Sequence, residues 1–368
     1  MSTVRLVVPP SSFFTFNNAS QPVIPPSIPH AIPGDIYTRL LDVRVPITIA
    51  TVYAFTVHYL NGLASTTTPP TPYAFAKTAL FKYLVILHNA LLAVYSGWTF
   101  VGITSTLQRT VSWDNGFGGF VHGLCKIHDD SVAVGINDVS GLGGVSRIGG
   151  SGLWEEGLAF YGWLFYLSKF YEVIDTAIIL AKGRKSSTLQ TYHHAGAMLC
   201  MWAGIRFMSP PIFIFVLFNS AIHTLMYTYY TLAALKIRVP MFMKRLLTTL
   251  QITQFLVGGS GAAIQIFISY VPPAVLNDIS DTIKENSGID VDILNTLNRE
   301  FVSCLSGGAE VWAVVTNVVY LTPLTYLFVM FFIRSYLAPR KTKTVAAKKE
   351  VEGKKTEAMK NTTTEIVG

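Results

Sequence analysis

Long apolar runs recur along the chain, separated by polar segments and by segments rich in Gly and Pro. A membrane-spanning helix needs about 20 predominantly apolar residues to cross about 30 Å of hydrocarbon. Seven runs reach that length, and we interpret each as a membrane-spanning helix: 45–64, 83–104, 158–181, 189–207, 210–235, 246–270 and 311–333. The pattern predicts an all-α polytopic membrane protein and leaves no separate soluble domain.

Composition agrees with this interpretation. Of 368 residues, 51% are hydrophobic and 13% are charged, whereas a soluble chain usually carries about 25% charge. The N-terminal stretch lacks the basic region, short apolar run and cleavage site of a signal peptide, so we expect no removable signal. Cys125, Cys200 and Cys304 are too few and too scattered for a disulfide framework or a thiolate metal site, and we expect structural thiols.

Basic residues gather in segments that share one side of a seven-span protein. They lie at 182–185, at 236–245 and in the tail after residue 338, whereas the segment between the sixth and seventh spans is acidic. The positive-inside rule then places the tail in the cytosol and the N-terminus outside it. We therefore predict a lumenal segment 1–44, a seven-helix membrane domain 45–337 and a disordered basic cytosolic tail 338–368. Only Asn18 of the two glycosylation sequons, at Asn18 and Asn361, would then be modified.

Ionisable and polar residues lie within four consecutive spans. A charged side chain at the centre of a membrane helix costs about 2.5–3.5 kcal/mol on insertion scales, so such residues tend to face the bundle interior and to be functional. At about 100° per residue, each set falls on one face of its helix. The third span presents Lys169, Glu172, Asp175 and Thr176; the fourth Gln190, His193 and His194; the fifth Asn219, His223, Met226, Tyr227 and Tyr230; the sixth Thr248, Gln251 and Gln254.

The direction of successive helices alternates. The third span runs toward the cytosol and carries its polar residues late, whereas the fourth and sixth leave the cytosol and carry theirs early, so all these groups lie in the cytosolic half of the membrane. His88 and Asn89, early in the second span, lie at the same depth. The simplest arrangement is seven helices around a polar chamber open to the cytosol, with an apolar tunnel continuing beyond it.

Four blocks in this region resemble, in order and spacing, the signature blocks of the ELO-type very-long-chain fatty acid elongases. They read KFYEVIDT, QTYHH, NSAIHTLMYTYY and TTLQITQF, where the family has KxxExxDT, HxxHH, NxxxHxxMYxYY and TxxQxxQF. The resemblance runs from about Lys169 to Phe255, with a weaker match at His88. The amino acids in the blocks are most similar to those of a fungal member. One departure is plain, because Gln190 stands where the family has the first histidine of HxxHH.

The resemblance implies a multi-pass enzyme of the endoplasmic reticulum membrane with a cytosolic C-terminus. Such a very-long-chain 3-oxoacyl-CoA synthase is an acyltransferase: it joins malonyl-CoA to a long-chain acyl-CoA with loss of CO2 and CoA, giving a 3-ketoacyl-CoA. It implies no cofactor and no metal. The net charge of +7 does not indicate a nucleic-acid partner, because the basic residues fall in particular loops and in the tail. The expected partners are the two CoA substrates, membrane lipid and the other enzymes of the elongation cycle, and a homo-oligomer stays open.

The same resemblance assigns roles to the stripe residues. His193 is the expected nucleophile, which would form an acyl-imidazole. Its catalytic neighbours would be His194, His223, Asp175 and Asn219. Substrate-binding candidates are Lys169, Glu172, Gln190, Tyr227, Tyr230, Gln251 and Gln254, with Lys182, Arg184, Lys185, Lys244 and Arg245 as candidates for the CoA phosphates.

Other interpretations stay open at this point. Lys169 and Glu172 fit an i,i+3 ion pair that only holds helices together, and the cations fit anchoring to anionic lipid. A membrane di-iron desaturase or hydroxylase would also use clustered histidines, although this chain has few for that purpose. A seven-span receptor or proton-coupled transporter fits the span count as well.

Overall fold

The computed structural model describes residues 3–15, 32–63, 71–113, 115–128, 152–276 and 301–337. The chain divides into two compact units, Met1–Val329 and Met330–Gly368. All packing discussed below lies within the first unit. The second unit contains the end of the last helix and the short π-helix η5 (Ile333–Leu337). The expected disordered tail 338–368 and both glycosylation sequons fall outside the described residues.

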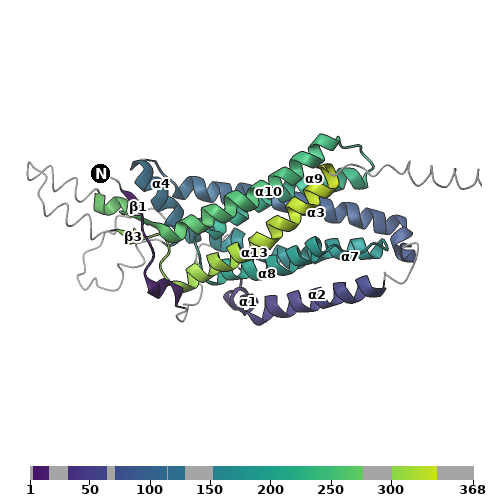
Figure 1. The fold of residues 1–368 in the computed structure, drawn as a ribbon, viewed down its shortest axis with the longest axis horizontal. Coiled ribbons are helices and arrows are strands. Elements are labelled where there is room, and N and C mark those ends of the chain that lie inside the picture. The colour runs from purple at the N-terminus through teal and green to yellow at the C-terminus, as the bar shows by residue number, and fades with distance from the viewer. Residues whose placement is uncertain are drawn as a thin grey trace, which may run out of the picture. The chain divides into compact units, whose positions relative to one another are not determined.

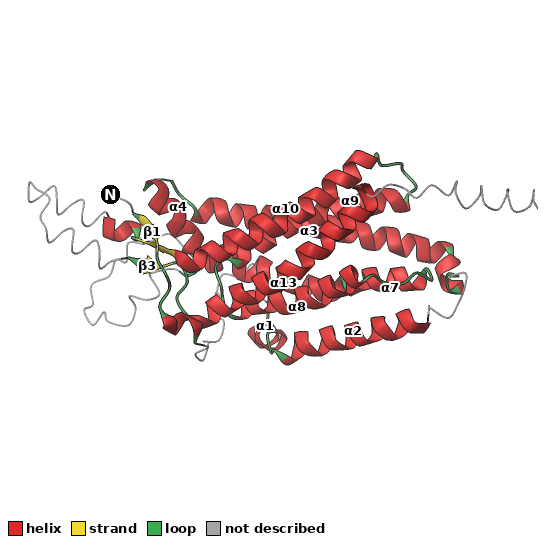
Figure 2. Cartoon of the chain, in the orientation of Figure 1, coloured by secondary structure: helices red, strands yellow, loops and turns green. Residues whose placement is uncertain are grey.

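The described chain is mostly helical, and Figure 2 shows the helices running lengthwise beside one another. Helical elements occupy all seven predicted runs, with shifted ends, except that residues 268–270 at the end of the sixth run form a strand. The main helices are α2 (Arg44–Leu63), α3 (Ala79–Thr110), α6 (Trp163–Tyr171), α7 (Val173–Ala181), α8 (Thr188–Arg206), α9 (Ile212–Ala234), α10 (Met241–Ile264) and α13 (Gly308–Phe332). The shorter elements are η1 (Ser11–Phe14), α1 (Gly34–Leu40), η2 (Ala74–Lys77), α4 (Gly116–Cys125), the π-helix η3 (Trp154–Gly162) and η4 (Gln265–Phe267).

Three of these segments are long and apolar enough to cross a membrane: α3, α9 and Gly308–Leu337. The pair α1 and α2, bent by 49° at their junction, counts as a fourth if it forms one span. The chain is therefore a multi-pass membrane protein. Polar residues on one face lower the mean hydropathy of α8 and α10, and the third predicted run is divided into η3, α6 and α7. The seven-span count therefore stays a prediction.

Local sequence explains several helix boundaries. The Thr78 hydroxyl accepts a hydrogen bond from the Phe81 backbone N–H (3.2 Å) at the start of α3, and Ser187 does the same for Gln190 (3.2 Å) at the start of α8. Ser and Thr are preferred N-caps because they satisfy otherwise unpaired N–H groups. The α8 cap therefore fixes the beginning of the helix that carries the adjacent histidines.

The largest buried core joins η3, α6, α8 and α9. Trp154, Tyr166 and Ile205 are fully buried there, and Tyr37 of α1 stacks on Trp163 at 5.0 Å between ring centroids. The α3 helix packs along α9, α2 along α8, and α10 along α9. These contacts hold the four helices that carry the polar stripes in fixed mutual positions.

A small sheet lies at one end of the helices, and Figure 1 shows its strands beside α4 and the N-terminus. Strands β1 (Val4–Leu6), β2 (Ile268–Tyr270) and β3 (Val302–Ser303) pair antiparallel in the order β1-β2-β3. The register places Val4 opposite Tyr270 and Tyr270 opposite Val302. The sheet thus gathers three segments that the charge pattern places on the lumenal side.

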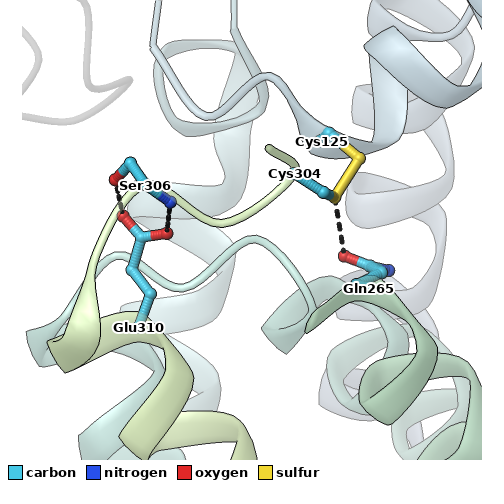
Figure 3. The surroundings of a disulfide bond; sticks show 5 residues. All are labelled: Cys125, Gln265, Cys304, Ser306 and Glu310. Carbon is cyan, nitrogen blue, oxygen red and sulfur yellow. Dashed lines mark hydrogen bonds between the residues drawn. A yellow bond between two sulfur atoms is a disulfide. The ribbon is translucent and has the colours of Figure 1, made fainter. Parts of the chain in front are cut away.

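A disulfide joins α4 to the segment after β3, as Figure 3 shows. It links Cys125 to Cys304 with a Cα–Cα distance of 4.8 Å, and the Cys304 sulfur also contacts Gln265 Oε1 at 3.6 Å. The expectation of three structural thiols was therefore wrong for these two residues, because folding brings together cysteines 179 positions apart. Cys200 is a buried free thiol, as expected.

Candidate active site

A buried ion pair lies where the helical run of α6 and α7 is interrupted. Glu172 falls at the break, with Lys169 one turn before it. The Lys169 Nζ donates to Glu172 Oε1 (2.6 Å) and to Asn219 Oδ1 of α9 (3.0 Å). Both charged side chains are almost fully buried, at 3% and 2% exposure. The pair is thus the expected i,i+3 contact, and it also reaches across to a second helix.

Two of the three clustered histidines face the same carboxylate. His223 Nδ1 lies 3.6 Å from Glu172 Oε1, and His194 Nδ1 lies 4.0 Å from Glu172 Oε2. Gln190, which replaces the first histidine of the family block, donates its amide to His194 Nε2 at 2.9 Å. An acceptor at Nε2 leaves the ring proton of a neutral His194 on Nδ1, directed toward Glu172. Gln190 therefore acts as an orienting group for this imidazole.

His193 points elsewhere, into a narrow cavity between α6, α8, α9, α10 and α13. The cavity has a volume of about 50 Å³ and mostly apolar walls. Besides His193, its polar groups come from Lys169, Asn219, Gln254 and Asn317, and both Gln254 and Asn317 are buried. Its apolar lining is Phe165, Ala197, Met201, Ile214, Phe215, Phe218, Phe255, Leu321 and Leu324. The arrangement places an imidazole, an ammonium and three side-chain amides at the boundary of an apolar space.

Tyr320 of α13 holds the backbone of α8 at this point. Its hydroxyl donates to the His193 carbonyl at 2.9 Å, and its ring stacks on Tyr192 at 5.5 Å. Gly196 lies one turn further along α8, and a Cβ there would collide with the Tyr320 ring. The glycine thus permits the close approach that positions the His193 segment.

Asp175 belongs to a second cluster. His88 Nε2 lies 2.8 Å from its Oδ1, and the Tyr227 hydroxyl donates to its Oδ2 at 2.6 Å. Tyr171 completes the cluster, with its hydroxyl 3.3 Å from His88 Nδ1. Asp175 was predicted as a catalytic neighbour of His193, but the imidazole that it contacts is His88 of α3.

The structure brings together most of the residues that the sequence nominated. Gln251 contacts the Met226 sulfur at 3.5 Å, close to the site. Tyr230 is 41% exposed and does not line the His193 cavity. The five cations nominated for phosphate binding lie outside the cavity, between α7 and α8 or on the first turns of α10: Lys182, Arg184, Lys185, Lys244 and Arg245.

Sequence reasoning missed the contribution of α13 and of two tyrosines. Asn317, Tyr320, Leu321 and Leu324 line the cavity from a helix whose apolar composition predicts only a span. Asn317, a single amide side chain within that apolar run, is the one feature of the sequence that could have indicated this contribution. Tyr53 of α2 lies edge-on to His194, with ring centroids 6.2 Å apart, but an aromatic residue in an apolar helix carries no pattern of its own.

The donor set around Glu172 does not have the form of a metal centre. Within the described ranges, no three His, Cys, Asp or Glu side chains are placed to hold one ion together. A di-iron cluster needs several ligands for each iron. The geometry therefore gives no specific support to the desaturase or hydroxylase interpretation.

The fold and the site together define a class of protein. It is a helical membrane protein in which imidazoles, an ammonium group and side-chain amides surround an apolar cavity. The sequence profile of the ELO family, described as the GNS1/SUR4 family, matches residues 39–344. The chain belongs to this family.

Individual relatives bear names of the same kind. The chain is 30% identical over 170 residues to "Putative fatty acid elongase 3" of Caenorhabditis elegans, which covers 46% of this chain and 45% of that protein. It is 38% identical over 99 residues to "Very long chain fatty acid elongase 3" of Homo sapiens, a match that covers 27% of this chain and 37% of that protein. It is 26% identical over 190 residues to "Fatty acid elongase 2" of Trypanosoma brucei brucei, a match that covers 51% of this chain and 60% of that protein.

Each of these matches spans less than two thirds of the relative's length. No solved structure matches the chain.

Proposed function

We propose that the protein is the condensing enzyme of fatty acid elongation. It would join malonyl-CoA to a long-chain acyl-CoA, release CO2 and CoA, and form a 3-ketoacyl-CoA. The observation that carries the proposal is the position of His193, which faces an apolar cavity beside Lys169, Asn219 and Gln254. Family membership and the names of the relatives support the same reaction.

The first step would be acyl transfer to His193. A neutral imidazole nitrogen attacks the thioester carbonyl, the carbon–sulfur bond breaks, and CoA leaves with the proton that the imidazole gives up. Lys169 and Asn219 line the same cavity, so they are placed to stabilise the oxyanion that develops on the carbonyl. His223 would carry the proton from His193 to the departing thiolate, and His194, whose Nε2 accepts from Gln190, would be a hydrogen-bonding partner.

The second step would form the new carbon–carbon bond. Malonyl-CoA loses CO2, the resulting enolate attacks the acyl carbonyl, the carbon–nitrogen bond to His193 breaks, and the released imidazole nitrogen takes up a proton from water. An acyl-imidazole survives only where water is scarce, and the apolar wall provided by Phe215, Phe255 and Leu321 would exclude it. A cavity of about 50 Å³ is smaller than the about 300–1,000 Å³ of typical ligand pockets, so these side chains must move when an acyl chain enters.

The proposed orientation is a seven-span protein of the endoplasmic reticulum with a cytosolic C-terminus. The Cys125–Cys304 disulfide supports it, because both cysteines lie in segments that the charge pattern places in the lumen, and disulfides persist in the lumen rather than in the cytosol. The polar site would then open toward the cytosol, where CoA thioesters are supplied. The other enzymes of the cycle would be partners on that side.

Condensation is tested with membranes that contain the protein, labelled malonyl-CoA and acyl-CoAs of graded length. We expect labelled 3-ketoacyl-CoA, and no product from the His193→Ala variant. Incubation with acyl-CoA alone should release CoA and add one acyl chain to the protein, detected by intact mass spectrometry after rapid quenching.

The control for the half-reaction is His88→Ala, because His88 contacts Asp175 rather than the His193 cavity. This variant should keep part of the adduct and of the CoA release. CoA release only when both substrates are present, with no adduct at any time, would favour direct attack in a ternary complex and leave His193 as a general base.

A further inference from the structure

A second and larger cavity lies between α2 and α7. It is a groove of about 1120 Å³, slightly above the about 300–1,000 Å³ of typical ligand pockets. Its walls are mostly apolar, with Ile49, Val52 and Leu60 from α2 and Val173 and Leu180 from α7. None of the residues proposed for catalysis lines it.

The groove is long enough for a complete lipid chain. Its lining on α2 runs from Thr48 to Leu63, which at 1.5 Å per residue spans about 22 Å. One leaflet contributes about half of the roughly 30 Å hydrocarbon core. The groove is therefore longer than the hydrocarbon thickness of one leaflet, and it accommodates the full length of one acyl chain.

Hydrogen bonds hold the groove together at the end where α2 and α7 finish. Asn61 Nδ2 donates to the Ser186 carbonyl and Asn61 Oδ1 accepts from the Ser186 N–H, each at 2.9 Å. The Tyr73 N–H donates to the Ala181 carbonyl at 3.1 Å. The end of α2, the segment before α3 and the α7–α8 connection thus form one assembled rim.

That rim carries positive charge. Lys182, Arg184 and Lys185 flank Gly183, which lines the groove, and all three cationic side chains are exposed. Partial burial, and then the Arg184 charge, lower the pKa of Lys182 below its usual value. No carboxylate of the described chain lies within ion-pair distance of these three cations. The rim is therefore complementary to an anionic group.

The inner wall separates the groove from the histidines. The Tyr53 hydroxyl and Thr176 Oγ1 are 2.8 Å apart and buried, and both residues line the groove. The Tyr53 ring also contacts the His194 ring edge-on, with centroids 6.2 Å apart. An occupant would contact the back of the site without reaching His193, so it is not a substrate in its reacting position.

We propose that the α2–α7 groove binds one chain of an anionic phospholipid, with the headgroup phosphate against Lys182, Arg184 and Lys185. Phospholipid is the occupant that the bilayer itself supplies beside an apolar groove, and anionic lipid is enriched in the cytosolic leaflet. Placement in that leaflet rests on the proposed orientation. The binding does not depend on condensing activity, so the two proposals fail separately.

Binding is tested on the full chain, purified in detergent and freed of endogenous lipid. The protein is mixed with equal amounts of phosphatidylserine and phosphatidylcholine that carry identical acyl chains, and native mass spectrometry counts the retained lipid. We expect one bound phospholipid and about a tenfold preference for phosphatidylserine, which corresponds to about 1.4 kcal/mol. Equal retention of the two lipids would overturn the assignment of the cationic rim.

A groove-filling variant tests the location. Ala177 is exposed into the groove from α7, so Ala177→Phe should reduce retained lipid at least tenfold. The matched control is Ile174→Phe, because Ile174 is 37% exposed on the same helix and does not line the groove. Thr56→Phe, from the α2 wall, provides a second filling variant if Ala177→Phe fails to fold. Equal retention by the filling variant and the control would refute the site.

A charge pair tests the headgroup contact. Lys182→Gln with Arg184→Gln should abolish the preference for phosphatidylserine while phosphatidylcholine binding persists. Lys236→Gln with Arg238→Gln removes the same charge from another exposed connection, between α9 and α10, and should leave the preference unchanged. Displacement of the phospholipid by stoichiometric palmitoyl-CoA, in the wild-type protein and in His193→Ala alike, would instead make the groove a CoA thioester site.

Discussion

The buried Lys169–Glu172 pair allows structural and catalytic contributions to be separated. Lys169→Met removes an ammonium that lies 2.6 Å from Glu172 and leaves the carboxylate 2% exposed without its charge partner. Breaking a buried pair in this way costs about 3–5 kcal/mol of stability. Asn219 Oδ1 also loses a donor at 3.0 Å, which adds about 1 kcal/mol. We expect the free energy of unfolding to fall by about 4–6 kcal/mol in total.

The double variant Lys169→Met with Glu172→Leu removes both charges. Replacing a buried pair by apolar residues of similar volume is often neutral, so stability should return to within about 1 kcal/mol of the wild type. Condensation should stay about 10²–10³ below the wild-type rate, because the loss of one preorganised oxyanion donor has that effect. The argument depends on Lys169 Nζ reaching both Glu172 and the His193 cavity.

Thermal unfolding of the purified protein in detergent and the labelled malonyl-CoA assay measure the two effects on the same samples. Leu225→Ala serves as a control, because Leu225 lies on α9, is 52% exposed and does not line the His193 cavity. A double variant that regains both stability and rate would show that the pair only holds α6 and α9 together. The catalytic role of Lys169 would then be abandoned.

The remaining predictions address metal, the disulfide and orientation. Condensation should persist without oxygen and after chelation, and Gln190→Ala should lower the rate less than His193→Ala; activity lost on chelation and restored by Fe(II) would favour an iron enzyme. Cys125→Ser should lower the free energy of unfolding by about 2–5 kcal/mol, and Cys304→Ser should add nothing to it, whereas additive losses would mean that the two thiols are not joined. Asn18→Gln should abolish a glycosidase-sensitive mass shift, and a shift that persists through the tail sequon would reverse the proposed orientation.

Sequence pattern predicted the helices and the polar stripes because both depend on local spacing. The set of Gln190, His193 and His194 on one face, for example, follows from the 3.6-residue period alone. The same period separates the two histidines in function, since adjacent residues lie about 100° apart. His193 therefore faces the cavity while His194 faces Glu172.

Pairings between distant segments were beyond that reasoning. Asp175 contacts His88, 87 residues away, because α3 packs along α9 and against η3, which precedes α6 and α7. The Cys125–Cys304 link likewise depends on the small sheet that brings α4 near β3. The role of Tyr320 depends on Gly196 in a different helix. Each contact is decided by tertiary packing, which a single sequence does not specify residue by residue.

The disulfide also sets an order of events during biosynthesis. Cys125 emerges early, but its partner Cys304 follows 179 residues later, after the segments that carry all four signature blocks. Covalent closure is therefore one of the last steps in making the protein. A chain that ends between Phe255 and Cys304 would contain every catalytic group proposed here and still present an unpaired Cys125 thiol. In an oxidising compartment such a thiol is open to mixed-disulfide exchange with other proteins, so truncated chains would be chemically distinguishable from finished ones.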